Sequence, residues 1–296
     1  MMRLTIKTIF KLLKETFQEW QQDKVSRLAA ALAYYTVFSI TPLLVIAIAI
    51  AGAVFGQEAA KGEIVDQING LVGDQGAKAI EVALANADRP DISGAASLIS
   101  IAILLLGASG VFAQLQDALN TIWNIQAKPN SGIWEFIRKR LLSFGMVLAI
   151  GFLLLVSLVV SAALSGIGKL ELSILPGFTF IWQIVNFTIS FSFIALLFAL
   201  IYKYLPDAKI KWDDVIVGAI ITALLFTLGK FVIGLYLGRG SLGSAYGAAG
   251  SLVIFLAWVY YSAQILLFGA EFTQVYARKF GKNITPNRHA QYMEGS

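Results

Sequence analysis

Six long stretches of this chain carry almost no charged side chains, and this feature constrains the fold more than any other. A transmembrane α-helix needs about 20 mostly apolar residues, because the hydrocarbon core is ~30 Å thick and each helical residue rises ~1.5 Å. Every stretch reaches that length, and only the fifth contains a charge. The sequence therefore predicts six transmembrane helices, over residues 28–56, 93–115, 141–165, 178–202, 215–237 and 248–270.

The overall composition agrees with a protein that lies in a bilayer. Hydrophobic residues make up 57% of the 296 residues and charged residues only 14%, whereas a soluble domain carries roughly 25% charged residues. A chain this apolar could not cover its own surface with polar groups. We therefore expect an all-α membrane protein with membrane lipids around it.

The distribution of basic residues predicts the orientation. Of the 23 lysines and arginines, 17 lie before the first span, after the second, after the fourth or after the sixth, and five lie on the opposite side. Basic residues in short loops favour the cytoplasm, so both termini are expected there. This topology also accounts for the net charge of +5, and no nucleic-acid partner is expected.

The regions outside the spans have their own patterns. Residues 1–27 alternate apolar and basic side chains at helical spacing, which is typical of a helix along the inner membrane surface. The acidic loop 57–92 lies within the transmembrane domain 28–277. It is expected to form two short amphipathic helices outside the cytoplasm, with Gly73 and Gly76 between them. Residues 278–296 are expected to form a polar cytoplasmic tail.

Two polar stripes are expected to face each other inside the bundle. Residues seven apart on a helix lie within about 40° of one another, which groups Arg27 with Tyr34 and Thr41 on the first span. Towards the end of the sixth span an arc of about 80° holds Tyr260, Gln264, Glu271 and Gln274. Because the first span leaves the cytoplasm and the sixth returns to it, the sequence predicts an ion pair between Arg27 and Glu271 at the inner face.

The first span is unusually polar around one proline. Pro42 lacks a backbone donor and should kink or break the helix, and it lies close to Tyr34, Tyr35, Ser39 and Thr41. Such side chains face other helices or a wet cavity rather than lipid. Two readings stay open: they line a substrate cavity, or the hydroxyls join helices together.

The fifth span contains Lys230, about 15 residues from its cytoplasmic start. Ionisable residues inside a membrane are costly and often functional. Lys230 is therefore a candidate for binding a phosphate or carboxylate within the bundle. The alternative is that its long side chain reaches the outer headgroups.

Catalytic chemistry is not expected. The chain has no cysteine, and its one histidine, His289, lies in the tail, so no catalytic dyad, metal site or cofactor is predicted. The glycine-rich residues 238–243 follow no predicted strand, which argues against a nucleotide-binding loop.

Three segments carry a resemblance to a known family. The stretches "AAALAYYTVFSITPLL" (29–44), "FAQLQDALNTIWNI" (112–125) and "WVYYSAQILLFGAEF" (258–272) resemble the YihY/BrkB family of bacterial inner-membrane proteins, and the likeness covers about residues 10–282. The resemblance implies six spans with both ends inside. It also implies links to serum resistance, as in a virulence factor, and to envelope lipid transport. Family members once bore the label ribonuclease BN, which is regarded as mistaken, and no catalytic residue carries over.

Two classes of function remain after these arguments. The first is a transporter or flippase of an amphipathic, anionic, lipid-like substrate, whose cavity is lined by Tyr34, Tyr35, Ser39, Thr41, Tyr260, Gln264 and Lys230. The second is a scaffold or structural protein of the envelope that does not transport. A ribonuclease is not expected. No ATP-binding motif is present, so transport would need a gradient or a partner.

Overall fold

The computed structural model describes residues 6–87, 95–128, 145, 178–239, 249–281 and 283–293. Long helices dominate these residues, and four of them are long and apolar enough to cross a membrane. An all-α membrane protein is therefore confirmed as the class. The helices are α1 (Ile6–Gln22), α2 (Val25–Phe55), α3 (Gln57–Ala87), α4 (Ala95–Ile122), α6 (Phe178–Tyr204), α7 (Trp212–Arg239) and α9 (Gly250–Phe280).

The helices follow the predicted spans closely, with two differences at their ends. Helices α2, α6 and α7 match the first, fourth and fifth predicted spans to within three residues at each end, whereas α4 continues seven residues beyond the second and α9 ten residues beyond the sixth. These extensions carry polar side chains out of the apolar stretch, which is why hydropathy alone stopped earlier. The predicted third span, 141–165, lies outside the described residues apart from Gly145.

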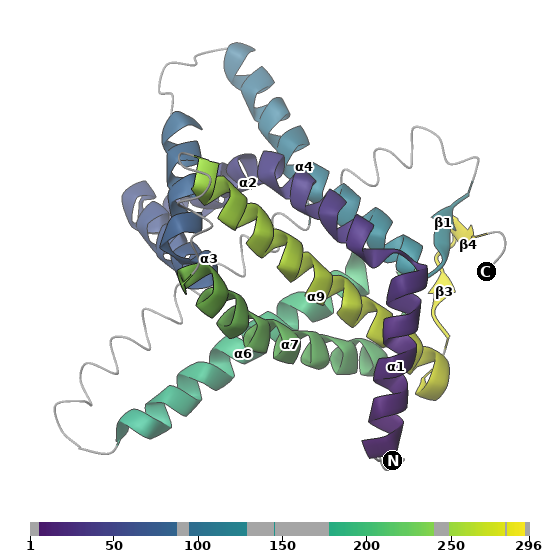
Figure 1. Ribbon diagram of the computed structural model, residues 1–296. Coiled ribbons are helices and arrows are strands. Elements are labelled where there is room, and N and C mark those ends of the chain that lie inside the picture. The colour runs from purple at the N-terminus through teal and green to yellow at the C-terminus, as the bar shows by residue number, and fades with distance from the viewer. Residues whose placement is uncertain are drawn as a thin grey trace.

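Helix α9 is the central element of the bundle. It packs against α1, α2, α3, α4 and α7, while α2 also packs against α3 and α4, and α6 packs on α7 (Figure 1). Figure 1 shows α1 crossing the C-terminal part of α9, close to the short strands.

Four short strands tie the helix ends together. Strand β1 (Ile125–Ala127) pairs antiparallel with β4 (Ala290–Tyr292), and β2 (Ala208–Lys209) pairs antiparallel with β3 (Thr285–Pro286). The tail predicted only as polar thus joins the segments that follow α4 and α6. We call this end of the bundle, which also carries the α1–α2 turn and the end of α9, the strand end.

The loop after the first span differs from its prediction. Two short helices were expected over 57–92, but α3 runs unbroken from Gln57 to Ala87. Side chains along its length, from Ala60 to Leu84, are buried in one cluster with α2 and α9. This packing explains the continuity, because tertiary contacts outweigh the weak helix propensity of the glycines at 73 and 76.

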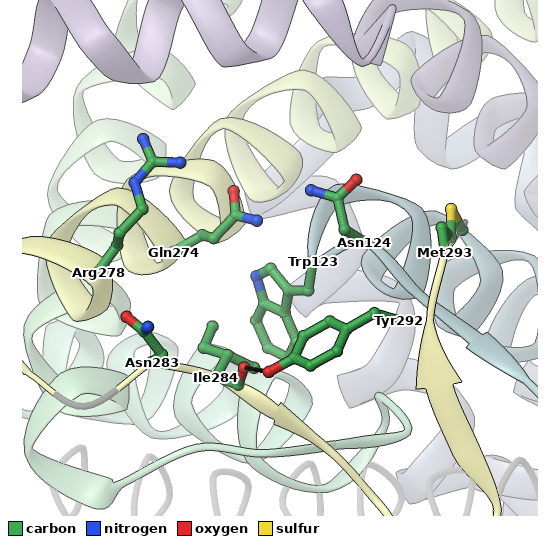
Figure 2. Close-up of a pocket in the computed structure, with 8 residues that line it drawn as sticks. All are labelled: Trp123, Asn124, Gln274, Arg278, Asn283, Ile284, Tyr292 and Met293. Carbon is green, nitrogen blue, oxygen red and sulfur yellow. Dashed lines mark hydrogen bonds between the residues drawn. The ribbon is translucent and has the colours of Figure 1, made fainter. Parts of the chain in front are cut away.

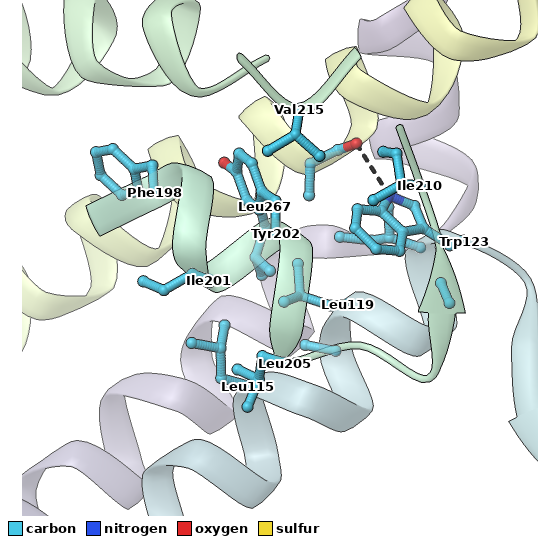
Figure 3. Packing of buried hydrophobic residues seen from close by; sticks show 14 of the residues in the cluster. Leu115, Leu119, Trp123, Phe198, Ile201, Tyr202, Leu205, Ile210, Val215 and Leu267 are labelled. Atoms are coloured by element: carbon cyan, nitrogen blue, oxygen red, sulfur yellow. Dashed lines mark hydrogen bonds between the residues drawn. The ribbon is translucent and has the colours of Figure 1, made fainter. Parts of the chain in front are cut away.

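The largest apolar cluster lies where α4, α6, α7 and α9 meet near the strand end (Figure 3). Tyr202, Leu205 and Leu119 are fully buried there. The indole Nε1 of Trp123 donates a hydrogen bond to the carbonyl of Ala270, at 3.2 Å, drawn as the dashed line in Figure 3. This bond ties the end of α4 to α9.

Helices α7 and α9 approach each other at two glycines. A Cβ added to Gly269 would overlap the hydroxyl of Thr222, and one added to Gly218 would overlap the hydroxyl of Thr273. The Tyr202 hydroxyl bonds the Leu266 carbonyl at 2.7 Å and lies 3.0 Å from the Thr222 oxygen. Small residues and such hydrogen bonds are what hold helices together in lipid.

Gly269→Ala should therefore lower the thermal unfolding temperature in detergent, because the added methyl overpacks the interface, at a typical cost of about 1–3 kcal/mol. Gly62→Ala on α3 is the matched control, since its Cβ would meet nothing within 4 Å. The control should unfold at the same or a higher temperature, because alanine favours an exposed helix by roughly 0.5–1 kcal/mol. Equal unfolding temperatures for the two variants would contradict the close approach.

The predicted orientation can be tested by cysteine labelling, because the chain has no native cysteine. A cysteine replacing exposed Lys78 on α3 should react with an impermeant maleimide in intact cells. One replacing exposed Gln22 should react only after permeabilisation. Ala77 is buried beside Lys78. A cysteine at position 77 should therefore react poorly, and Ala77→Cys is the control for accessibility. Labelling with the opposite sidedness would overturn the orientation.

Candidate functional site

Ser39 and Pro42 lie in the contact between α2 and α4. The Ser39 hydroxyl is buried and donates a hydrogen bond to the Gly107 carbonyl, at 2.6 Å. A Cβ on Gly107 would come within 3.1 Å of the Pro42 ring. Helix α2 continues through Pro42 without a break, so the proline and the serine serve helix packing here.

The other polar residues of the first span lie differently. Tyr34 is 61% exposed and its ring packs on Phe38, with centroids 4.9 Å apart. Tyr35 is partly exposed beside Gly110 of α4, and Thr41 is half-buried. Their role in lining a substrate cavity stays a prediction.

Lys230 was a candidate for anion binding within the bundle, with a side chain that reaches the outer headgroups as the alternative; among the described residues its side chain is exposed. Its neighbours Phe231 and Val232 are exposed as well. Thr227, one turn before Lys230 on α7, donates its hydroxyl to the Ala223 carbonyl of its own helix, at 2.8 Å. The described helices do not enclose Lys230, and substrate binding by this lysine also stays a prediction.

The predicted ion pair between Arg27 and Glu271 does not form, and this prediction is wrong. Arg27 is exposed on the first turn of α2, whereas Glu271 is 0% exposed. The neighbour of Glu271 is Asp23, in the turn between α1 and α2, with which it shares a hydrogen bond. Depth along the helices was estimated correctly, but the direction in which Arg27 points depends on how α2 is rotated in the bundle.

Helix α1 covers a polar stripe on α9. We define this stripe as Tyr260, Gln264, Glu271 and Gln274, which lie along one side of α9. The side-chain oxygen of Gln264 accepts a hydrogen bond from the indole Nε1 of Trp20 on α1, at 3.1 Å. Its amide nitrogen donates to the Tyr260 hydroxyl, at 2.8 Å. Two predicted site residues, four apart on α9, thus bond each other, and Gln264 also bonds Trp20, which the sequence did not single out.

Two surface ion pairs and an apolar contact hold α1 in place. Arg278 bonds Glu19 at 2.8 Å, and Lys279 bonds Glu15 at 3.1 Å. All four side chains are partly exposed, and such pairs are worth about 1 kcal/mol or less each. Leu12 of α1 is buried with Phe272 and Val275 of α9, and this apolar contact adds to the attachment.

A pocket of about 400 Å³ opens at the strand end (Figure 2). Figure 2 shows the side chains of Arg278 and Gln274 from α9 on one side of the opening, and Asn124 and Trp123 from the end of α4 on the other. The C-terminal segment closes it below, with the Tyr292 hydroxyl bonded to the Ile284 carbonyl at 2.9 Å. The remaining lining residues are Asn283 and Met293. A cation, three amides and two aromatic rings therefore surround this space.

A buried polar network anchors the tail beside this pocket. The Asp207 carboxylate is 1% exposed and accepts hydrogen bonds from the amides of Asn120 and Gln116, at 3.0 and 3.4 Å. Its other oxygen lies 3.0 Å from Nε2 of His289. The histidine that was placed in a polar tail is thus part of the packing at the strand end. The only sequence signal for it is that Gln116 and Asn120 are four residues apart, on one face of α4.

The described residues contain no group of three or more histidine, aspartate and glutamate side chains that could hold a metal ion. The polar groups at the strand end are suited to bind an anion by Arg278 and by amide hydrogen bonds.

These observations define an integral membrane protein with a polar strand end. A family model described as "Virulence factor BrkB" matches residues 16–294. The chain therefore belongs to the BrkB family. The resemblance found in the three sequence segments is thereby confirmed.

Several curated relatives bear the name UPF0761 membrane protein. One from Mannheimia succiniciproducens is 31% identical over 281 residues, which cover 93% of this chain and 92% of the relative. One from Psychromonas ingrahamii is 30% identical over 279 residues, covering 90% and 88%. One from Halorhodospira halophila is 30% identical over 284 residues, covering 92% of this chain but 59% of the relative. No solved structure matches the chain.

Asp207→Ala should destabilise the protein and expose the tail, because it leaves the buried amides of Asn120 and Gln116 without their acceptor. Each such group costs about 1–3 kcal/mol. Thermal unfolding in detergent and the rate of tryptic cleavage after Arg288 measure the two effects.

The control for this variant is Asp213→Ala, an exposed acid in the first turn of α7. A carboxylate at a helix N-terminus is worth only about 0.3–1 kcal/mol. The network has no anchoring role if both variants unfold at the same temperature and resist trypsin equally.

Proposed function

We propose that this chain is a transporter or flippase for an amphipathic, anionic, lipid-like molecule, and that it has no catalytic site. The proposal places it in the bacterial inner membrane with the strand end in the cytoplasm. The observation that carries it is the pocket at the strand end, which lies at the same end of α9 as the polar stripe.

The lining of the pocket favours an anionic headgroup. The guanidinium of Arg278 presents paired donors that match phosphate or carboxylate oxygens, and the amides of Asn124, Gln274 and Asn283 can donate to the same groups. A volume of about 400 Å³ lies within the usual range for small-molecule sites. The space suits a headgroup, while acyl chains would remain in the bilayer.

The polar stripe supports movement of such a headgroup along α9. Gln274 lines the pocket, and Gln264 and Tyr260 continue in the direction of the far end of the bundle. Moving a polar headgroup into lipid alone is costly. Polar side chains at membrane depth lower that cost, because they can form hydrogen bonds with the headgroup. Tyr34, Tyr35, Thr41 and Lys230 remain the proposed contacts for the rest of the path.

A non-transporting scaffold is the second candidate, and the contact between α2 and α4 favours it. Ser39 and Pro42 are used there for close helix packing, which is what a purely structural bundle requires. In this reading, the strand end and the exposed face of α3 would bind other envelope components.

Lipid scrambling in vesicles separates the two candidates. Purified protein is reconstituted in vesicles of phosphatidylethanolamine and phosphatidylglycerol that contain a trace of NBD-labelled phosphatidylglycerol, and dithionite then quenches the accessible label. A flippase lets the reagent remove inner-leaflet fluorescence as well. Loss of outer-leaflet fluorescence only, as in protein-free vesicles, both without and with a pH gradient across the vesicle membrane, would contradict transport of this lipid class.

Variants then assign the site. Arg278→Gln should slow the loss of inner-leaflet fluorescence about tenfold, which corresponds to ~1.4 kcal/mol of lost headgroup binding. Lys279→Gln is the matched control, because Lys279 makes the parallel ion pair to α1 but does not line the pocket. Equal rates for the two variants would exclude the pocket as the headgroup site.

A further inference from the structure

Glu271 is a buried acid without a basic partner. Its side chain is 0% exposed in the interior of α9, and no N–H or hydroxyl group of the described residues donates a hydrogen bond to either carboxylate oxygen. The carboxyl group of Asp23 is its hydrogen-bonding neighbour. Two ionised carboxylates cannot hydrogen-bond to each other, so a bond between these groups requires a proton on one of them.

The charged groups around this pair favour the bound proton. Glu19 of α1 adds a further negative charge, and Arg278 of α9 is the cation that acts on Glu271. Arg278 is already paired with Glu19. Arg27 of α2 is exposed, and at the end of α4 the neutral Trp123 bonds the Ala270 carbonyl. From α7, the neutral Thr222 and Gly218 face this part of α9.

We propose that Asp23 and Glu271 form a site for one proton, and that the bound proton holds α1 over the polar stripe of α9. Asp23 lies in the turn that follows α1, so a change at this pair acts directly on that helix. Lys24, the next residue, has a φ of 52°, a left-handed conformation at the point where the chain passes from α1 to α2.

The pH dependence follows from the burial of Asp23. Burial raises the pKa of the Asp23 carboxyl, the hydrogen bond from Glu271 lowers it, and the charge of Glu19 raises it again, with a net increase. A raised pKa means that the docked state binds the proton more tightly than the undocked state does. Docking is therefore strongest at low pH and weakens as the pH rises through the raised pKa.

Proton release is coupled to the pocket through Glu19. When the pair ionises, the negative charges of buried Glu271 and half-buried Asp23 repel each other and α1 leaves α9. The departure of α1 also removes Glu19 from Arg278, which frees the guanidinium for an external anion. This step rests on the proposed function, and it assigns protons as the driving ion for transport of an anionic headgroup.

Distances between spin labels test the proton site without any transport assay. Labels are placed on cysteines that replace exposed Gln18 of α1 and exposed Lys209 of β2, in a chain without other cysteines. One docked distance is expected at about pH 5. At higher pH a second distance should appear, with the docking equilibrium falling by up to about tenfold per pH unit, the slope for one proton.

Neutral variants identify the groups that bind the proton. Glu271→Gln keeps the shape of the side chain and supplies a permanent donor to Asp23, so it should stay docked from about pH 5 to about pH 9. Asp23→Asn should likewise remove the pH dependence. Glu15→Gln is the control, because it removes a surface ion pair of α1 and should keep the wild-type pH dependence.

The outcomes separate this inference from the proposed function. The proton site is overturned if the wild-type distance does not change between about pH 5 and about pH 9. It is also overturned if the Glu271→Gln variant changes with pH as the wild type does. If the distances behave as expected while the vesicles show no lipid movement, the proton site stands and the transport function fails. If lipid moves but the distances do not respond to pH, the function stands and the proton site fails.

Discussion

The contact between α7 and α9 is the interaction on which the rest of the structure depends. Helices in lipid gain little from apolar burial against each other, because acyl chains are as apolar as leucine. Here Gly218 and Gly269 let the two backbones come close enough for Thr222 and Thr273 to fill the space opposite. Since α9 also packs against α1, α2, α3 and α4, this contact sets the position of the polar stripe.

The polar groups of the described residues gather at the strand end for a physical reason. Buried polar side chains need partners, and α9 continues past the apolar stretch to supply them. The pocket, the Asp207 network and the carboxyl pair all lie where α1 and the C-terminal strands meet α9. Helix α1 links the polar stripe to the pocket, because it contributes Trp20 to the stripe and Glu19 to Arg278.

The candidate site was only partly predictable from the sequence. Helical spacing placed Gln264 and Glu271 on one side of α9, and the structure shows both facing α1 or its turn. The partner of Glu271 was missed. Arg27 was expected to be that partner because it lies at a similar depth, but the rotation of α2 leaves the Arg27 side chain exposed. His289 was missed because no local pattern links residue 289 to Asp207.

The sequence by itself determined the membrane class and the extent of most helices. Backbone groups in lipid must bond within their own segment, so a long uncharged stretch has little choice but to form a helix. Only the tertiary structure decided which side chains meet, such as Trp20 with Gln264 and Asp23 with Glu271. Such pairings depend on how rigid helices rotate and cross, and those angles come from packing between distant residues rather than from local spacing.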